Sequence, residues 1–362
     1  MENDKTKGSG MVEHIQVTRD ESSWEVEIKG EIPADALLRH RQEALKELQK
    51  TAKMDGFRPG HAPIERIVAV YGETTIMRRT AEHAIQSVLP ELLAKENILI
   101  IETPRVQTEN PEAGKPLPFT ARASLPPHVE LPDWKKIAHK HNEKKETTTI
   151  SDEERTQAKT HMRRERARVE KMEAGAEPQK AAEEAKATPE ADLPTLDDVF
   201  ARSIGYESVE AFEEALHSNM KKEKETQAKQ ILRNAILDEL AKESKIQYPA
   251  ILKEYELDDM EGRIREDLAR FGSTFENYLE QTKKTREAIR TEWSEAADKR
   301  AKTRLILSEI AKQEKIVPDE DRVETELKHA KEHYKDADPA NLRAGIVHAM
   351  RNEKVLELLE SQ

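Results

Sequence analysis

The helical period that runs from Val209 almost to the C-terminus constrains this chain most. One helix predicted there, from about Thr282 to Lys315, would be roughly 50 Å long at ~1.5 Å per residue, which is too long for a compact globule. Hydrophobic residues make up 36% of the 362 residues, charged residues also 36%, and aromatic residues 4%. We therefore expect an elongated, mainly helical molecule with a thin apolar core.

The charge balance and the residue types exclude several classes of protein. The chain has 60 Lys and Arg against 72 Asp and Glu, a net charge of −12, which argues against non-specific DNA binding. It has no Cys, so disulfides, thiolate zinc sites and cysteine nucleophiles are excluded. Met1–Gly10 is polar and reads as a disordered lead-in, and no apolar run approaches the ~18 residues of a membrane span. We expect a cytoplasmic protein with neither DNA nor membrane as a partner.

The first part of the chain predicts an α+β domain over residues 11–132. Val12–Thr18 and Trp24–Lys29 alternate apolar with polar residues, which is the pattern of an antiparallel hairpin. Helices are then predicted from Pro33 to Gly56, from Pro63 to Tyr71 and from Thr74 to Asn97, and strands from Ile98 to Val106 and from Phe119 to Leu125. Pro90 should bend the last of these helices.

A connector is predicted over residues 133–194. Ser151-Asp152-Glu153-Glu154 is a capping signature that opens a helix over 151–173. Residues 174–194 are mostly Ala, Glu, Lys and Pro, and predict a flexible or weakly helical linker. Residues 195–362 then form an elongated all-α C-terminal domain.

The loop Gly56–Pro63 is the most informative segment for function. It contains two Gly and two Pro, which is typical of a shaped loop, and it places Phe57 beside Arg58 at its tip. One interpretation is that Phe57 packs back into its own domain, as most large aromatic side chains do. The other is that Phe57 enters an apolar pocket of a partner, worth roughly 1.5–3 kcal/mol, while Arg58 binds phosphate or carboxylate.

This loop, GFRPGHAP, resembles the ribosome-docking signature of trigger factor, a family of bacterial chaperones at the nascent-chain exit. The resemblance continues through ERIVAVYG after the loop, through ISDEER to KMEAG in the predicted linker helix, and through LPTLDDVFARSIGYESVEAFEEALHSNMKKE beyond it. It implies that the loop contacts protein and RNA of the large ribosomal subunit through Gly56, Phe57, Arg58, Pro59, Gly60, His61 and Pro63. His61 stands where the family commonly has a basic residue, which implies weaker or less salt-dependent docking.

The resemblance has one large departure. Family members usually carry a prolyl isomerase domain of the FK506-binding type, of about a hundred residues, before the C-terminal domain. Here only Ala174–Leu193 separates the two matching parts, and a segment of this composition does not form a twisted sheet around an aromatic pocket. We therefore expect that the isomerase domain and its catalytic residues are absent.

The function implied by the resemblance is an ATP-independent chaperone that shields nascent or unfolded polypeptides in a helical cradle. The candidates for its lining are Met220, Leu257, Met260, Ile264, Phe271, Phe275 and Met350. The alternative is that they form the core between helices. The resemblance also implies a homodimer off the ribosome.

Two other functions stay open, a prolyl isomerase and a helical adaptor or scaffold that binds no client. His329 and His333 have the i, i+4 spacing of metal ligands, with Glu326 as a third group, but a solvated polar face is the commoner reason for this pattern. The basic run 163–168 is likewise more typical of an exposed helix face than of an RNA contact. We expect no metal and no cofactor.

Overall fold

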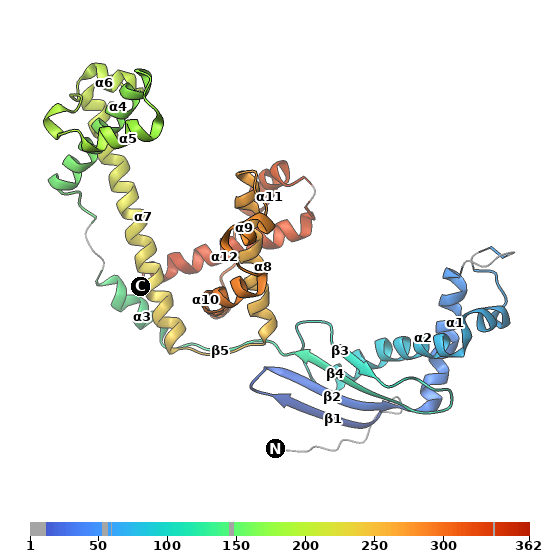
Figure 1. Cartoon of the computed structure of the whole chain (residues 1–362). Helices are drawn as coiled ribbons and strands as arrows, with labels where there is room; N and C mark the ends of the chain where they lie inside the picture. The colour runs from blue at the N-terminus through green and yellow to red at the C-terminus, as the bar shows by residue number, and fades with distance from the viewer. Residues whose placement is uncertain (1–11, 53–56, 59, 145–147, 336) are drawn as a thin grey trace. The chain divides into compact units, whose positions relative to one another are not determined.

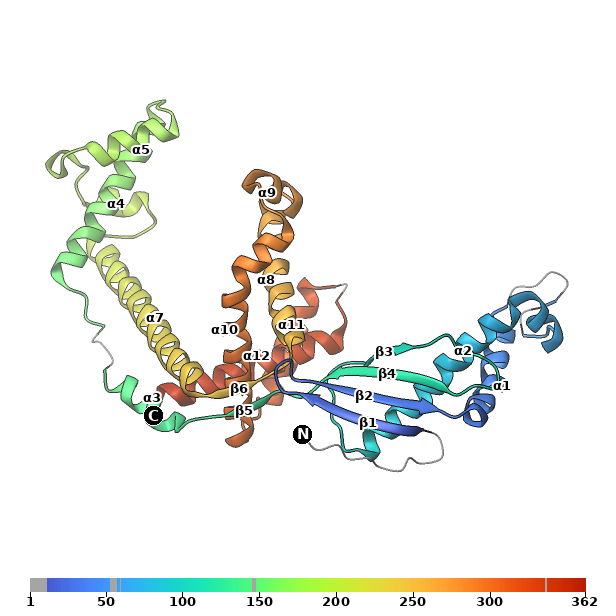
Figure 2. The ribbon, with the colours of Figure 1, turned by 60° about the horizontal axis from the view of Figure 1, so that its bottom comes forward.

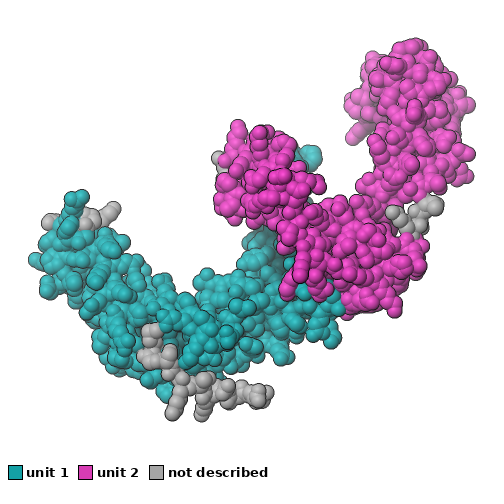
Figure 3. Space-filling view, turned by 180° about the vertical axis from the view of Figure 1, so that it is seen from behind, with its two compact units in different colours: residues 1–131, 244–309 teal, residues 132–243, 310–362 magenta. Residues whose placement is uncertain are grey.

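The computed structural model describes residues 12–52, 57–58, 60–144, 148–335 and 337–362. The chain forms two compact units, each built from two separate segments (Figure 3). The first unit comprises Met1–Leu131 with Ser244–Glu309, and the second Pro132–Glu243 with Ile310–Gln362. The first unit thus combines the predicted α+β domain with helices that the sequence analysis assigned to the C-terminal domain.

A four-stranded antiparallel sheet forms the first part of unit 1. It contains β1 (Glu13–Asp20), β2 (Glu25–Ile32), β3 (Arg105–Thr108) and β4 (Leu117–Ser124), in the order β1-β2-β4-β3 (Figure 1). Burial alternates along β2, as the sequence predicts for a half-buried strand. The predicted hairpin and the strand predicted from Phe119 to Leu125 are confirmed. The strand predicted from Ile98 to Val106 is wrong for residues 98–104, because β3 begins only at Arg105 and continues to Thr108.

Two helices accompany the sheet, α1 (Ala34–Thr51) and α2 (Ile64–Lys95), and α2 runs along one of its faces (Figure 2). The only non-helical backbone angles within α2 lie at Gly72, whose φ is +75°, a conformation that glycine adopts without strain. This break separates the two helices that the sequence predicted. Helical backbone angles continue through Pro90, and the bend expected there stays a prediction.

The core of this part lies between the sheet and the second half of α2. Its largest fully buried members are Ile28, Ile32, Val88, Val26 and Leu117. Gly30 is required by the packing, because a Cβ there would lie 2.9 Å from the Phe119 ring and 2.9 Å from the Val12 side chain. A smaller second core joins α1 to the start of α2 through Leu45, Leu48, Ala52, Ala62, Ile67 and Ile76.

The remainder of unit 1 is a helical hairpin. β5 (His128–Glu130) pairs antiparallel with β6 (Lys245–Gln247), which leads into the helices. These are α8 (Ala250–Arg270), α9 (Phe275–Thr282) and α10 (Arg286–Gln313). The long helix predicted from about residue 282 to 315 is confirmed as α10, which begins four residues later than expected because Lys283, after the end of α9, takes a left-handed φ of +53°.

The regular elements in the described part of unit 2 are all helices. Its elements are α3 (Trp134–Asn142), α4 (Asp152–Glu173), α5 (Pro178–Ala187), a 3₁₀ turn (Glu190–Asp192), α6 (Asp198–Ser203), α7 (Val209–Glu243), α11 (Glu320–His333) and α12 (Pro339–Glu360). The capping box that begins α4 is confirmed: Glu154 N donates to Ser151 Oγ and Ser151 N to the Glu154 carboxylate.

The segment 174–194 corrects the prediction of a flexible or weakly helical linker. It contains α5, which packs against α4, and Ala185 and Leu193 are buried with Ala167. The Arg163 guanidinium fixes the segment's end by donating to the main-chain oxygens of Pro194 at 2.7 Å and Leu193 at 2.8 Å. Alanines placed one turn apart give a face narrow enough for close helix packing, although the composition resembles a linker.

Candidate functional site

The loop between α1 and α2 contains the predicted docking residues. Gly56 and Pro59 lie outside the described residues, whereas Phe57, Arg58, Gly60, His61 and Pro63 are described. Pro63 precedes the first residue of α2 and has φ −59°, which suits the start of a helix. The structure therefore places the described part of the loop directly against two helix ends.

Gln49 of α1 fixes the base of this loop with two hydrogen bonds. Its main-chain oxygen accepts from Gly60 N at 3.0 Å, and its Nε2 donates to the main-chain oxygen of Ala62 at 2.6 Å. Ala62 is buried in the second core, and Gly60 has φ +88°, where a side chain would be strained. Sequence reasoning missed Gln49, because nothing in the pattern of α1 distinguishes it from the other polar residues.

The tip of the loop is exposed. The side chain of Phe57 keeps 40% of its surface accessible, and Arg58 and His61 are also exposed. His61 N donates to the Arg58 main-chain oxygen at 3.0 Å, which makes a tight turn here. Among the described residues, the Arg58 guanidinium has no ion-pair partner. The ring and the guanidinium are therefore both accessible to a partner.

An ion pair connects the two helices, α1 and α2, that flank the loop. Arg41 of α1 binds the Glu73 carboxylate with Nη2 at 2.8 and 3.0 Å from its two oxygens. Glu73 directly follows the break at Gly72, so this pair connects α1 to the start of the longer part of α2. Ile64 and Val70, on the short part of α2 beside the loop, leave about half or more of their side chains exposed.

The candidates for client binding fall into different environments. Phe271, at the end of α8, is 88% exposed, and Met260 and Ile264 on the same helix are half-buried. Met220 of α7 and Met350 of α12 are half-buried and belong to unit 2.

Leu257 and Phe275 correct the prediction, because they are only 3% and 2% exposed and do not line an open surface. The Phe275 ring packs on Tyr278 and under the Arg265 guanidinium, which lies 4.4 Å from its centroid. Phe275 therefore anchors α9 to α8. It belongs to the helix–helix core that the sequence analysis kept as the alternative.

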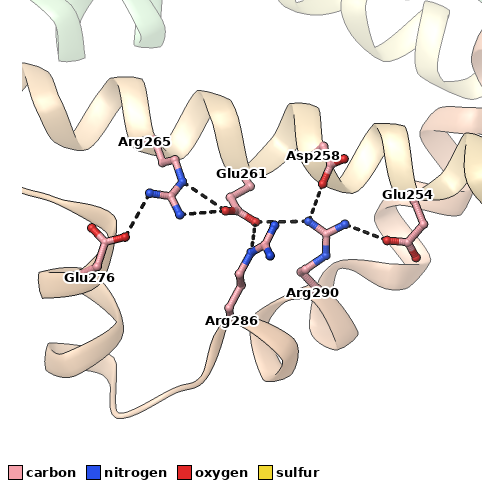
Figure 4. A network of polar contacts seen from close by, with 7 residues as sticks. All are labelled: Glu254, Asp258, Glu261, Arg265, Glu276, Arg286 and Arg290. Carbon is pink, nitrogen blue, oxygen red and sulfur yellow. Dashed lines mark hydrogen bonds and ion pairs between the residues drawn. The ribbon is translucent and has the colours of Figure 1, made fainter. Parts of the chain in front are cut away.

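The hairpin is also held by a buried carboxylate, which Figure 4 shows. Glu261 of α8 is only 5% exposed and accepts from three guanidinium groups: Arg286 Nε at 2.8 Å, Arg265 Nη2 at 2.9 Å and Arg290 Nη1 at 3.2 Å. Burial by itself would raise the pKa of Glu261, but the bonds from Arg286 and Arg265 outweigh it and hold this pKa below the ordinary value. Glu261 is therefore ionised at neutral pH.

The network extends along the hairpin. Arg290 also binds Asp258 and Glu254, each at 2.8 Å, and Arg265 reaches Glu276 of α9 at 3.2 Å (Figure 4). A second buried carboxylate, Glu256, accepts from Arg300 and Arg304 of α10 at 3.1 and 3.0 Å. Sequence reasoning missed both buried carboxylates, Glu256 and Glu261. The only sequence pattern that points to this network is the i, i+4 spacing of Arg286 and Arg290 on α10. Each buried carboxylate is neutralised by arginines, so the network joins helices and provides no general base.

The part of the chain that the structure describes offers no metal site and no membrane-crossing helix. No cluster of three or more His, Asp or Glu side chains there could hold a metal ion, and the trio of Glu326, His329 and His333 is included in that finding. None of the described helices combines the length and the apolar character needed to cross a bilayer.

Comparison with protein families decides the relationship. The model of the bacterial trigger factor protein matches residues 14–162, and the model of the trigger factor C-terminus matches residues 208–360. The chain belongs to the trigger factor family. Among the relatives, a trigger factor of Caldicellulosiruptor saccharolyticus is 25% identical, over 79% of this chain and 80% of the relative. A trigger factor of Clostridium botulinum is 24% identical, over 92% of this chain and 95% of the relative.

A solved structure shares the fold. It comes from work on promiscuous substrate recognition in folding and assembly activities of the trigger factor chaperone. The match has a TM-score of 0.53 at 16% identity and covers 96% of this chain and 99% of the other. This likeness supports the predicted fold class, an α+β N-terminal region followed by a mainly helical chain.

The two family matches leave residues 163–207 between them, and all of these residues are described. They form the end of α4, then α5, a 3₁₀ turn and α6, with no strand. The isomerase domain of the FK506-binding type is built on a sheet. This trigger factor chain therefore lacks that domain at the position where the family usually carries it.

Proposed function

We propose that this chain is an ATP-independent chaperone that docks on the large ribosomal subunit near the tunnel exit and shields nascent or unfolded polypeptides. Membership of the trigger factor family supports the general activity. The observation that supports docking is the exposed Phe57–Arg58 tip on a loop whose base Gln49 fixes. This function places the chain in the cytoplasm.

The fixed base matters because an ordered loop loses less conformational entropy on binding than a mobile one. The Phe57 ring buries its exposed part in an apolar pocket, and Arg58 donates to RNA phosphate or to a carboxylate. Partial burial of one Phe stabilises a complex by about 1–2 kcal/mol, which is roughly 5–30-fold in affinity.

Cosedimentation with ribosomes tests this docking, and the chain provides a matched control. Arg270 and Phe271 are a second exposed pair of the same two residue types, at the end of α8. We expect Phe57→Ala and Arg58→Ala each to weaken pelleting at least fivefold, and Phe271→Ala and Arg270→Ala to pellet like the parent. Equal pelleting of all four variants would overturn the assignment of the loop.

Suppression of aggregation of an unfolded protein tests the second half of the proposal and separates a chaperone from a helical adaptor. The exposed Phe271, with the half-buried Met260 and Ile264 beside it, provides an apolar surface on α8. We expect Phe271→Ala to reduce suppression and Phe57→Ala to leave it unchanged without ribosomes. If the parent chain does not suppress aggregation, it is an adaptor and not a chaperone.

A prolyl isomerase is the other candidate function. The helical segment 163–207 disfavours it, because a twisted sheet is needed for that catalytic pocket. A proline-limited refolding assay decides between an isomerase and a chaperone without that activity, and we expect the chain not to accelerate refolding.

Sedimentation velocity without ribosomes tests the homodimer that the family resemblance implies.

A further inference from the structure

A groove with a volume of about 810 Å³ lies in unit 1, away from the docking loop. Three residues of α2, Ile85, Leu89 and Leu93, line one side of it. The other side comes from the segment that leads from α2 into β3 and includes Ile100, Ile101 and Val106. The lining is thus mainly apolar, and its surroundings are too, since Ile101 is 38% exposed and the neighbouring Leu99 is 74% exposed.

The charge in this groove has one sign. Its only charged lining residues are the carboxylates Glu82 and Glu102, and no Lys, Arg or His lines it. Glu82 also pairs with Arg79 at 2.8 Å, and Glu102 accepts from Ser124 Oγ at 2.5 Å. Both oxygens of each carboxylate have further lone pairs, so a basic group can still approach them. An apolar ligand with a positive charge at its end is complementary to this surface.

An exposed strand edge borders the groove. β3 is the last strand of the sheet, and among the described residues only β4 pairs with it. Val106 belongs both to β3 and to the groove lining. The main-chain groups on the outer edge of β3 are therefore available to an added strand, and side chains of such a strand alternate between the groove and the solvent.

We propose that this groove binds an extended apolar polypeptide segment flanked by basic residues, which adds as a strand to the outer edge of β3. The inference rests on the proposed chaperone function for the source of such a segment, and it assigns a client site to the α+β part of the chain. A second copy of the chain fits less well. An isologous contact would bring the carboxylates of two grooves together, which costs free energy.

Fluorescence anisotropy with the full chain tests the proposal. The probe is the labelled peptide Lys-Lys-Val-Ile-Val-Leu-Val-Lys, compared with a version flanked by Glu and with one N-methylated at alternate residues. We expect the Lys-flanked peptide to bind at least fivefold more tightly than either of the others. The Glu flanks meet like charges, and N-methylation removes the main-chain donors that strand addition needs.

Two variants change the groove without changing its buried core. Ile101→Ser removes exposed apolar surface, and we expect it to weaken binding of the Lys-flanked peptide at least fivefold. Glu82→Lys reverses one rim charge, and we expect it to reduce the preference for Lys flanks over Glu flanks at least threefold. The matched control is Leu38→Ser on α1, which removes a side chain that is 55% exposed outside the groove. It should bind within twofold of the parent.

The outcomes separate this proposal from the proposed function. Peptide binding that Phe271→Ala abolishes and the groove variants leave unchanged would overturn the groove and leave the chaperone intact. Groove variants that change the sedimentation coefficient but not peptide binding would show that a second copy occupies the groove, which also overturns it. Groove variants that bind the peptide more weakly but pellet with ribosomes like the parent would support the groove as a client site. Circular dichroism verifies that each variant is folded.

Discussion

Two parts of unit 1 are stabilised in different ways. In the α+β part, the described buried residues of the sheet and α2 are apolar except for Thr80 and Ser124. In the helical hairpin of α8, α9 and α10, the buried set includes two carboxylates, Glu256 and Glu261, beside apolar side chains such as Ile289 and Ile306. The difference teaches how a chain with as many charged as hydrophobic residues folds both a sheet and long helices.

A sheet covered by a helix encloses volume, so it concentrates apolar residues. A pair of long helices has a narrow seam and much exposed surface, so few apolar residues are needed to fill it. The hairpin uses arginine–carboxylate bonds along this seam instead, and the bonds from Arg286 and Arg290 of α10 to Glu261 of α8 connect the two helices. We therefore expect the stability of the hairpin to depend more on its buried charges than the stability of the α+β part does.

Removing apolar volume from the sheet should produce the largest effect. Ile28 is fully buried on β2, and Ile28→Ala should lower the free energy of unfolding of the α+β part by about 2–5 kcal/mol, because it leaves a cavity. Hydrogen exchange of peptides from residues 13–124, measured against denaturant, checks this. Ile231→Ala, at an exposed position of α7, should change its own region by less than about 0.5 kcal/mol. Equal losses at the two positions would contradict the comparison.

Removing the charge at Glu261 should produce the next largest effect, and only in the hairpin. Glu261→Gln leaves three arginines without their shared carboxylate. Loss of a fully buried pair costs about 3–5 kcal/mol, but Arg265 and Arg286 are about half exposed, so we expect about 1–3 kcal/mol. Exchange should accelerate in peptides from residues 250–309 and stay unchanged in those from the sheet. Glu266→Gln, an exposed position on the same helix, is the control and should change neither.

The features that could be predicted from the sequence are those set by neighbours along the chain. Alternation over Val12–Thr18 indicated a strand, and the Ser151–Glu154 spacing indicated a helix cap. The exposed position of Phe57 followed from no local pattern, because the burial of a loop side chain depends on what packs behind it. Here that support is Gln49, whose role requires Gly60 and Ala62 to return to α1.

Contacts between residues far apart in the sequence could not be predicted either, because they too depend on how the chain folds back on itself. Glu261 and Arg286 are separated by a complete helix, α9, so no periodicity connects them. Phe275 resembled a surface residue because its neighbours in sequence are polar, yet Arg265 and Tyr278 cover its ring. Residues 174–194 resembled a linker, since alanine supplies little apolar volume, but Ala185 and Leu193 pack with Ala167 of α4 and Lys171 bonds Glu184 of α5.

Acidification should produce the smallest of these effects and distinguishes the two parts without any mutation. The pKa of Glu261 is held below the ordinary 4.5, because hydrogen bonds from Arg286 and Arg265 outweigh its desolvation. A carboxylate whose pKa is lower in the folded state adds stability that is complete above about pH 4.5 and disappears as the pH falls through the lowered pKa.

Between pH 7 and pH 3, hairpin peptides should therefore lose exchange protection, corrected for intrinsic rates, before sheet peptides do. In Glu261→Gln this difference should shrink, since the variant has no carboxylate at 261 to titrate. A parental chain in which sheet and hairpin lose protection together would show that an apolar seam, and not the arginine–carboxylate network, determines the stability of the hairpin.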